Sequence, residues 1–415
     1  MIVFSEEFSL SKSYLQGTHR ACDPAQTWEW LLPKARAVGV TRVARVNGLD
    51  AIDLPVWVAV RPNSRGLSTS QGKGLSHDAA RVSAAMESVE NWHGETMECS
   101  VRIADWQSIQ QDAPAVDPQS LNYYRDTPPR SDVALPWIAA CDLVSQSPCW
   151  VPYECVSTDY VVKSDGSLRS TFVQSSNGLA GGNHILEAVA HGLYELIERH
   201  AIARDIDLIR SFNSEIRLEP SRILDPACRD ILHRIEAAGC QTAIFSLPSG
   251  FGIPVFACSI LQVDEGIRWH ALPPFNGYGC HLDASVALLR ALTEAVQSRV
   301  TYIAGSRDDI PLAEYGRGGN PDDLRSYKSL FAQPADHPAH LDAQAFASFE
   351  QDIQHMVHVL VAHGYDQVLV ADLRKRGLDI PVVKALVPGL STPETLIRGR
   401  SVHVPPLREV KPKTV

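Results

Sequence analysis

The stretch from Gln174 to Asp205 constrains this chain more than any other, because it joins a loop of small residues to a long helical pattern. The loop reads Ser-Ser-Asn-Gly-Leu-Ala-Gly-Gly-Asn and ends at Asn183, a residue type that often caps a helix N-terminus. From Leu186 to Ile197, apolar residues recur at helical spacing and share one arc of the expected helix. The opposite side carries three carboxylates and one guanidinium: Glu187, Glu195, Glu198 and Arg199.

This acidic stripe has two interpretations. A charged helix face is usually exposed to solvent, so a lone stripe predicts a solvated surface. Carboxylates beside a guanidinium can also hold metal ions and phosphate oxygens, above all where a Gly-rich turn leads into the helix. The stripe by itself leaves both interpretations open, and the rest of the chain has to decide between them.

Composition excludes several classes of protein. The 415 residues carry 38 Lys and Arg against 48 Asp and Glu, and this net charge of −10 argues against a general nucleic-acid binder. The nine cysteines form no C-x-x-C pair, which argues against structural zinc and suits reduced thiols in the cytoplasm. The N-terminus does not resemble a signal peptide, and no apolar window approaches the roughly 18 residues of a membrane span. We therefore expect a cytoplasmic protein.

No linker is long or biased enough to separate a second domain, so we expect one domain over residues 1–415 with internal subdomains. The Pro- and Gly-rich segment 305–345 predicts a mobile surface loop, and the tail 404–415 is expected to be extended. The periodicity predicts helices near 78–93, 184–203, 225–238, 283–304 and 342–363, and strands at 54–60, 241–247, 254–261, 367–372 and 382–387.

Two further Gly-containing loops precede helices. The loop from Ser68 to Gly74 leads into a helix that carries Glu87 and Glu90, and it matches neither the Walker A pattern nor G-x-G-x-x-G. A third turn, at 275–283, precedes a helix whose Arg290, Glu294 and Gln297 share a face, which can equally be a salt-bridged surface. Two loops of one plan, each followed by two carboxylates one turn apart, indicate a shared site for a polyanion and metal.

The number of carboxylates indicates which metal. Gathered together without cations, they would repel one another strongly. Oxygen ligands without Cys or His favour Mg²⁺, which usually also holds substrate phosphates. Lys73, Arg20, Arg199 and Arg299 are the candidates for phosphate contacts. The residues thus predict a site for Mg²⁺ and a nucleotide, without a reaction, built around Glu87, Glu90, Glu187, Glu195 and Glu198.

These motifs resemble the YcaO family over nearly the whole chain. They are Ser70-x-Gly72-Lys73-Gly74, Ser83-Ala84-x-x-Glu87-x-x-Glu90, Ser176-x-Gly178-x-Ala180-x-Gly182-Asn183, Glu195-x-x-Glu198-Arg199 and the run from Arg290 to Arg299. The resemblance implies an α+β fold that binds ATP without a P-loop, with mixed or antiparallel sheets packed against helices. It also implies that ATP phosphorylates a peptide amide oxygen, which a nucleophile then displaces. A Cys, Ser or Thr side chain gives an azoline, and sulfide gives a thioamide.

Carried over by position, the resemblance implies roles for individual residues. Glu87, Glu90, Glu195 and Glu198 would be Mg²⁺ ligands, with Glu187 also in the metal–nucleotide site. Asn183, Arg199 and Arg299 would contact ATP, with Ser70 and Lys73 in the same nucleotide site. Arg20 and Thr27 match the spacing of an N-terminal Lys and Ser that contact nucleotide in some members, although the residue types differ. Glu87, Glu195 and Arg199 would be catalytic. His200 stands where the family often has Asp.

Four shorter motifs resemble the branch found beside TfuA proteins, which is associated with peptide thioamidation: 17–20, 39–42, 61–64 and 387–389. The tail has Pro405, Pro406 and Pro412 but lacks the Pro-x-Pro-x-Pro end of azoline-forming members. We therefore expect thioamide formation, with a cyclodehydratase, a macroamidine-forming enzyme and a non-catalytic accessory protein as alternatives. The implied partners are a peptide substrate, a TfuA-like or other sulfur- or peptide-delivering protein, and a second copy in a homodimer. Cys280 is a candidate sulfur relay.

Overall fold

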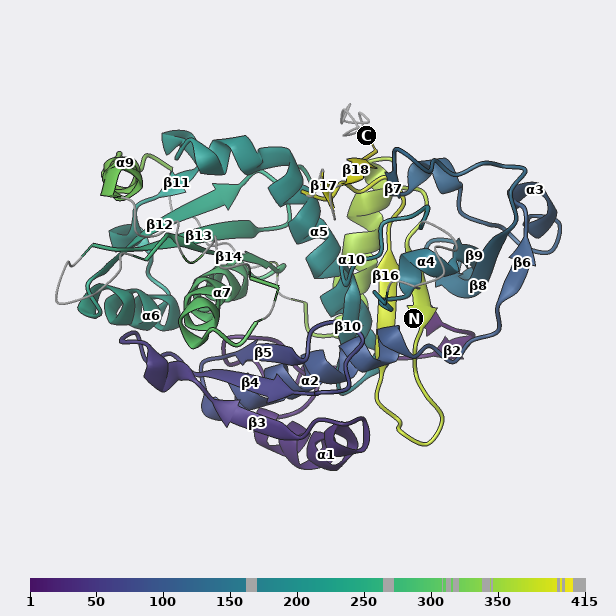
Figure 1. Cartoon of the computed structure of the whole chain (residues 1–415), viewed down its shortest axis with the longest axis horizontal. Coiled ribbons are helices and arrows are strands. Elements are labelled where there is room, and N and C mark those ends of the chain that lie inside the picture. Colours follow the sequence, from purple (N-terminus) through teal and green to yellow (C-terminus); the bar gives the residue numbers. More distant parts are fainter. Residues whose placement is uncertain are drawn as a thin grey trace.

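A long helix, α5 (Ile185–Arg210), runs through the middle of the molecule, and the sheets are arranged around it (Figure 1). A four-stranded sheet lies on one side of α5 and a six-stranded sheet on the other, while a three-stranded sheet with two helices lies below both in this view. The structure is a computed structural model that describes residues 1–161, 170–263, 272–307, 309–310, 315, 321–337, 344, 346–393, 396–397 and 400–405.

Three strands lead directly into the three longest helices of the described chain. The sequence predicted Gly-containing loops or turns at these places, and that prediction was wrong because each place contains a strand. The units are β5 (Thr69–Lys73) with α2 (His77–Glu95), β10 (Leu179–Gly181) with α5, and β14 (Phe275–Cys280) with α7 (Ala284–Ala304).

The glycines in these strands are required by close packing against the helix backbone. A Cβ atom on Gly72 would lie 2.1 Å from the carbonyl oxygen of Ala80, and one on Gly279 would lie 2.1 Å from that of Ala287. No side chain fits at such distances, so only glycine lets the strand lie this close to the helix. The small residues therefore reflect strand–helix packing and not loop flexibility.

The three-stranded sheet carries the first unit. Its strands β3 (Arg42–Arg45), β4 (Val56–Val60) and β5 pair antiparallel, and α1 (Pro24–Ala37) packs against α2 on this sheet. Helix α1 begins after Asp23, whose carboxylate accepts a hydrogen bond of 2.8 Å from the Ala25 amide, and Pro24 occupies the first turn.

The four-stranded sheet carries the third unit. Helices α6 (Pro226–Ala237) and α7 pack together on it, and their apolar side chains form a buried core of their own. A short helix, α9 (Pro321–Phe331), lies at the far end of this side of the molecule (Figure 1). The strands run in the order β11 (Arg217–Leu218), β12 (Cys240–Leu247), β13 (Val255–Gln262) and β14, all antiparallel.

The six-stranded sheet carries the second unit. It runs in the order β10, β16 (Val382–Leu386), β15 (Leu369–Asp372), β8 (Leu135–Asp142) and β6 (Arg102–Ala104), with β9 (Ser147–Pro152) also paired to β8. Helix α10 (Phe349–Ala362) packs against α5.

Small sheets join β7 (Tyr123–Tyr124) to β18 (Arg400–His403) and β17 (Leu396–Ile397), and β1 (Ile2–Val3) to β2 (Glu6–Glu7). Shorter helices are α3 (Trp106–Ile109), α4 (Tyr153–Val156) and four 3₁₀ turns at Asn47–Leu49, Pro118–Ser120, Ser214–Ile216 and Pro220–Arg222.

Every pairing between named strands in these described ranges is antiparallel. Helices pack on the sheets, so the α+β prediction is confirmed. The assignment of 1–415 to one domain stays a prediction. Among the described helices, none combines the length and the apolar character that crossing a bilayer requires.

Three local predictions need correction or restriction. The N-cap of α5 is His184 and not Asn183, because the His184 ring accepts a hydrogen bond from the Leu186 amide. The segment 305–345 contains α9, whose start carries Pro321 followed by two acidic residues, a typical helix-start pattern. Other parts of that segment, and residues 406–415 of the predicted tail, lie outside the described residues.

Candidate functional site

Each strand–helix unit holds one helix carboxylate in the same way. The carboxylate accepts a hydrogen bond from a backbone amide 16 or 17 positions earlier, in or just before the preceding strand. This repeat places three carboxylates at equivalent points of three units, which sequence reasoning did not foresee for the third. The pairs are Gln71 N with Glu87 Oε2 at 3.1 Å, Gly178 N with Glu195 Oε2 at 3.2 Å, and Tyr278 N with Glu294 Oε1 at 3.3 Å.

A contact between two units brings the carboxylates of α2 and α5 together. Glu90 on α2 accepts a hydrogen bond of 2.6 Å from the amide of Gly181 on β10. A Cβ atom on Gly181 would lie 3.0 Å from that same carboxylate oxygen, so the glycine keeps the approach open. Glu90 thus contacts the strand that leads into α5, and beyond desolvation the charge of Glu195 on α5 raises the pKa values of both Glu87 and Glu90. The predicted approach of the α2 carboxylates to Glu195 is therefore present, and their role as metal ligands stays a prediction.

The acidic residues of α5 do not form a solvated stripe. Glu187 is 2% exposed and Glu198 is 4% exposed, while Glu195 is half-buried. Oε2 of Glu198 has no hydrogen-bond partner within the described part of the chain. A buried carboxylate oxygen without a partner is costly, so this atom indicates a missing cation or donor.

Burial and mutual repulsion raise the pKa values of these carboxyl groups. Desolvation raises the pKa of Glu90 to about 8, with further increases from Glu87 and Glu195. Desolvation and the neighbouring Glu294 raise the pKa of Glu198 to about 7. Desolvation also raises the pKa of Glu195, although Arg199 opposes it. The chain therefore gathers more acidic groups here than its own cations neutralise.

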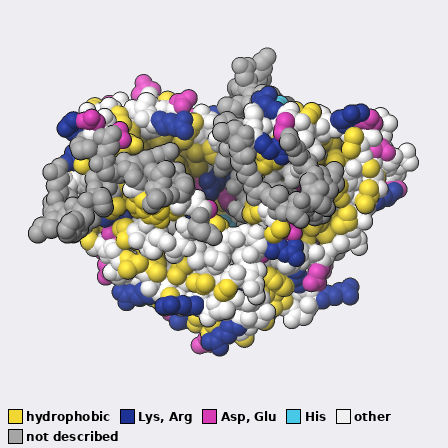
Figure 2. Space-filling view, in the orientation of Figure 1, with side chains coloured by type: hydrophobic (Ala, Val, Ile, Leu, Met, Phe, Trp, Pro, Cys, Tyr) yellow, Lys and Arg dark blue, Asp and Glu magenta, His cyan; other side chains and the backbone are white. Residues whose placement is uncertain are grey.

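Glu87 shows where this cluster meets solvent. Its side chain is exposed, yet enough protein surrounds the carboxyl group for desolvation to raise its pKa to about 7. Exposure of the side chain and a desolvated carboxyl group are both expected for a residue on the wall of a concave cleft that is open to solvent. Figure 2 shows a hollow at the centre of the face drawn in Figure 1, with basic and acidic side chains visible inside it.

Basic side chains border the acidic cluster. Nζ of Lys73 lies 2.7 Å from Glu294 Oε2 and 3.1 Å from Gln297 Oε1, which links the first unit to the third. Although desolvation opposes it, Lys73 keeps the pKa of Glu294 below its usual range. Nη2 of Arg290 lies 3.3 Å from the ring of His191. Desolvation and then Arg290 place the pKa of His191 well below its usual range, so this histidine adds no positive charge.

The N-terminal residues predicted for the nucleotide site converge on the start of α5. Arg20 Nε lies 3.6 Å from Glu187 Oε1, while Oε2 of Glu187 accepts from the Ala21 amide at 3.2 Å. Thr27 Oγ1 donates to Asn183 Oδ1 at 2.9 Å, and the Asn183 amide donates to Glu187 Oε2 at 3.3 Å. The structure therefore brings Arg20, Thr27, Asn183 and Glu187 together, and their role as nucleotide contacts stays a prediction.

Arg299 and Ser70 have partners within the protein. The Arg299 guanidinium is fully buried, pairs with Asp50 at 2.9 Å and donates to Gln262 Oε1 at 2.8 Å. Its Nη1 has no hydrogen-bond partner among the described residues. Ser70 is buried, and its hydroxyl accepts from Asn91 Nδ2 at 3.5 Å. Neither residue shares a hydrogen bond with the five carboxylates in the described ranges, so their assignment to ATP rests on the resemblance alone.

Cys280 does not have the environment of a reactive thiol. It is fully buried on β14, and burial raises its pKa well above the usual range. The reactive form of cysteine is the thiolate, which such an environment disfavours. The structure gives no physical support to a sulfur relay at this residue.

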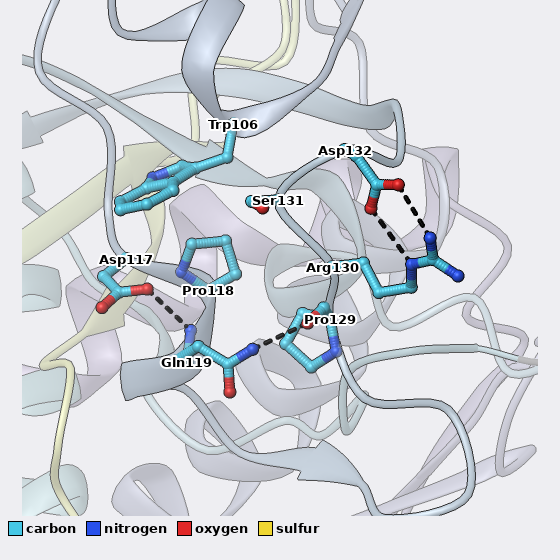
Figure 3. Close-up of a pocket in the computed structure, with 8 residues that line it drawn as sticks. All are labelled: Trp106, Asp117, Pro118, Gln119, Pro129, Arg130, Ser131 and Asp132. Atoms are coloured by element: carbon cyan, nitrogen blue, oxygen red, sulfur yellow. Dashed lines mark hydrogen bonds and ion pairs between the residues drawn. The ribbon is translucent and has the colours of Figure 1, made fainter.

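A surface pocket lies away from these residues. It has a volume of about 360 Å³, and its lining includes the hydrogen bond from Gln119 Nε2 to the Pro129 carbonyl (Figure 3). Its charged pair, Arg130 and Asp132, lies at 2.7 Å and is exposed, so each charge already has its partner. None of the predicted site residues lines this pocket, and it offers no unbalanced charge to a ligand.

The chain is similar to known proteins in sequence and in fold. Residues 71–391 match the family model described as YcaO cyclodehydratase, ATP- and Mg²⁺-binding. An uncharacterized protein from the tfuA 3′ region of Rhizobium leguminosarum bv. trifolii is 35% identical over 400 residues, which cover 93% of this chain and 91% of that protein.

Two solved structures share the fold. A heterocyclase in complex with substrate and cofactor superposes with a TM-score of 0.74 at 20% identity, covering 93% of this chain and 54% of that one. YcaO from Methanopyrus kandleri, bound with AMPPCP and Mg²⁺, superposes with a TM-score of 0.70 at 24% identity, covering 92% of this chain and 94% of that one. The chain therefore belongs to the YcaO family, a family described as ATP- and Mg²⁺-binding.

Proposed function

We propose that this protein uses ATP and Mg²⁺ to phosphorylate a backbone amide of a peptide, and that sulfide then displaces the phosphate to leave a thioamide. The observation that carries the proposal is the buried excess of carboxylates, in which an oxygen of Glu198 has no described hydrogen-bond partner. A donor set made only of carboxylate oxygens fits Mg²⁺, because this ion is bound by hard oxygen ligands. The residues present therefore fit the metal that the family binds.

The proposed metal ligands are the carboxylates that the structure gathers from α2 and α5. When bound, Mg²⁺ supplies positive charge beside the phosphate oxygens of ATP. Because a ligand carboxyl must lose its proton, the raised pKa values keep part of the cluster neutral until the ion arrives. The ligands are Glu87, Glu90, Glu195 and Glu198, with Glu187 at the edge of the same site.

The chain's own cations and polar groups orient the nucleotide. Lys73 and Arg199 border the carboxylates and are proposed to bind phosphate oxygens, where charge-assisted hydrogen bonds are strongest. Arg20 is held by Glu187, and Asn183 is held by Thr27, so these side chains are already positioned. Such positioning is the main contribution of a protein to phosphoryl transfer. Arg299 and Ser70 keep their proposed place in the nucleotide site from the family resemblance.

Two observations bear on the product of the reaction. The relative from the tfuA 3′ region supports the thioamide and a TfuA-like partner. The description of the family as cyclodehydratases and the similarity in fold to a heterocyclase favour azoline or macroamidine formation as a second candidate. A homodimer is proposed in both cases. The intact acidic cluster speaks against a purely accessory protein, because an accessory protein has no need of buried, repelling carboxylates.

Glu195→Gln tests the site. We expect ADP formation from Mg-ATP to fall about 100-fold or more, because even outer-shell changes at metal sites cost about 10–100-fold. Glu29→Gln is the matched control, since Glu29 is an exposed carboxylate on α1 outside the cluster. Unchanged ADP formation in Glu195→Gln would rule out the proposed site.

Mass spectrometry separates the two products. The protein is incubated with Mg-ATP, sulfide and a candidate peptide, with a parallel sample lacking sulfide. Exchange of oxygen for sulfur adds about 16 Da and needs sulfide, whereas cyclodehydration removes about 18 Da and does not, although both use the same phosphorylated amide. Mass loss without sulfide would replace the thioamide by the second candidate.

A further inference from the structure

A small cavity adjoins the acidic cluster along α5. It has a volume of about 240 Å³ and lies between α5, β16 and the segment from Val173 to Asn177. Leu196 and Arg199 on α5 line it, and they alternate along the helix with Glu195 and Glu198. The amide of Gly178, next to Asn177, binds Glu195 at 3.2 Å. The cavity and the proposed metal site thus share the same helix and the same loop.

The cavity has the opposite charge from the neighbouring cluster. Its charged lining residues are the two cations Arg199 and Lys384, and no carboxylate belongs to its described lining. Leu121, Val173 and Leu196 add apolar surface. Such a lining suits a neutral group that carries an acceptor oxygen, and it does not suit a metal ion.

Lys384 is an unusual residue in its strand. It is 2% exposed in the middle of β16, which pairs with β10 on one side and β15 on the other. Its ammonium donates to the carbonyl oxygen of Ser175, and an ammonium has three protons to donate. No ion pair within 4.0 Å involves it in the part of the chain that the structure describes. A buried lysine bonded to one neutral carbonyl can still donate to a ligand.

The volume limits the size of that ligand. A cavity of about 150 Å³ is enough for a benzene-sized molecule, and drug-sized ligands occupy roughly 300–1,000 Å³. The observed volume of about 240 Å³ falls between these values. It is sufficient for one amino-acid residue with its peptide group.

We propose that this cavity binds the substrate residue whose backbone amide is phosphorylated, and that Lys384 donates a hydrogen bond to its carbonyl oxygen. The inference rests on the proposed function, and it adds a substrate-binding residue and the location of the peptide. The amide would then lie on the Arg199 side of the phosphates, next to the carboxylates of α5.

Lys384→Met tests the proposal, with Lys375→Met as the matched control. Lys375 is also buried, at 4% exposure, and its ammonium also donates to a main-chain carbonyl, that of Thr96, but it does not line the cavity. The probe is a set of N-acetylated, C-amidated Gly-X-Gly tripeptides, incubated with the protein, Mg²⁺ and a non-hydrolysable ATP analogue. Retained peptides are read by affinity-selection mass spectrometry.

We expect wild type and Lys375→Met to retain the same peptides, and Lys384→Met to bind them about tenfold or more weakly, the effect of losing one charge-assisted hydrogen bond. Val173→Trp, which fills the cavity from a half-buried position and keeps Lys384, is expected to lose the same peptides. Equal retention by Lys384→Met and wild type, or no retention by wild type, would overturn the inference.

Calorimetry of Mg-ATP binding to the wild-type protein separates this failure from failure of the proposed function. Absence of Mg-ATP binding would contradict the proposed function itself. Mg-ATP binding with equal peptide retention in both lysine variants would contradict only the role of the cavity.

Discussion

Two clusters in the described part of the chain contain groups that bind metals elsewhere, but only one of them is balanced by its own cation. The carboxylates of the proposed Mg²⁺ site form one cluster. In the other, His19, His281 and Asp352 place ligand atoms within 4.8 Å of one another. In this second cluster Lys12 pairs with Asp352 at 2.7 Å, and the Tyr194 hydroxyl donates to it at 3.0 Å.

The histidines of the second cluster contribute no charge. Burial and then Lys12 lower the pKa of His19 to about 4, and burial places that of His281 well below the usual range. The same cations that oppose protonation of these rings would repel a metal ion. Ligand residue types alone therefore do not identify a metal site, whereas a buried charge that the chain leaves unbalanced does.

The largest expected effect concerns the cluster that is already balanced. In Lys12→Met, Asp352 keeps a buried charge without its cation, and the free energy of unfolding should fall by about 3–5 kcal/mol. Denaturant unfolding measures this. The double variant Lys12→Met with Asp352→Asn removes both charges and should recover part of the loss. A loss below about 1 kcal/mol in the single variant would mean that the pair contributes no more than a surface ion pair.

The second prediction concerns ligands and separates the clusters. Mg²⁺ with ATP should stabilise the wild-type protein by about 2.7 kcal/mol at one hundred times the dissociation constant, because the ligand binds the folded state. Glu90→Gln should remove most of this gain, while His19→Gln should keep it. Thermal unfolding with Mg-ATP, and with EDTA in its place, measures the difference. A gain lost in His19→Gln and kept in Glu90→Gln would reverse the assignment.

The third prediction is a pH dependence of the metal-free protein. The folded pKa values of Glu198 and Glu90, about 7 and about 8, exceed the ordinary value of 4.5. The folded state then holds protons that the unfolded state has lost, so this contribution to stability is complete below about pH 4.5 and disappears as the pH rises through 7–8. Each proton changes the free energy of unfolding by at most about 1.4 kcal/mol per pH unit.

The melting temperature measured with EDTA should therefore fall as the pH rises from 5 to 8.5. The same series measured on Glu90→Gln gives the pH dependence of the rest of the chain, which is subtracted. The gain on adding Mg²⁺ should grow over the same interval, because the ligands must be deprotonated. A gain from Mg²⁺ that does not change with pH would contradict the raised pKa values.

The smallest effect is expected at Arg20. Its side chain is 30% exposed and lies 3.6 Å from Glu187, so Arg20→Lys should change stability by less than about 1 kcal/mol. The positive charge is retained, and Mg-ATP affinity should change less than about tenfold. Arg20→Met is the comparison variant, and calorimetry measures both. A larger loss in Arg20→Lys than in Lys73→Met would show that the planar guanidinium is required.

The helices of the site were predictable because their information is local. The expected ranges 78–93, 184–203 and 283–304 correspond to α2, α5 and α7, since apolar spacing and absence of Pro act within a few turns. The strands β5, β10 and β14 were not predictable in the same way. Their glycines and polar residues suggest a loop, and only the helix packed against them explains why a side chain is excluded.

Two further residues of the site, Glu294 and Lys384, also have recognisable patterns in the sequence. Glu294 follows its strand amide by the same interval as Glu87, so the repeat was present in the sequence. Lys384 stands in the apolar run Val-Val-Lys-Ala-Leu, where a buried charge indicates a role for the lysine. The position of Arg299 could not be read in advance, because its partner Asp50 lies 249 positions away.

The sequence by itself determined which helices form, which faces carry carboxylates, and the family to which their spacing points. Only the tertiary structure decided which carboxylates meet, and which cluster contains its own cation. The reason is that helical periodicity acts over three or four residues, whereas charge balance depends on contacts between distant segments. Gly181 and Glu90 are 91 positions apart, and Lys12 and Asp352 are 340 apart. Contacts between segments so far apart in the sequence decide which carboxylates come together and which of them receive a cation from the chain itself.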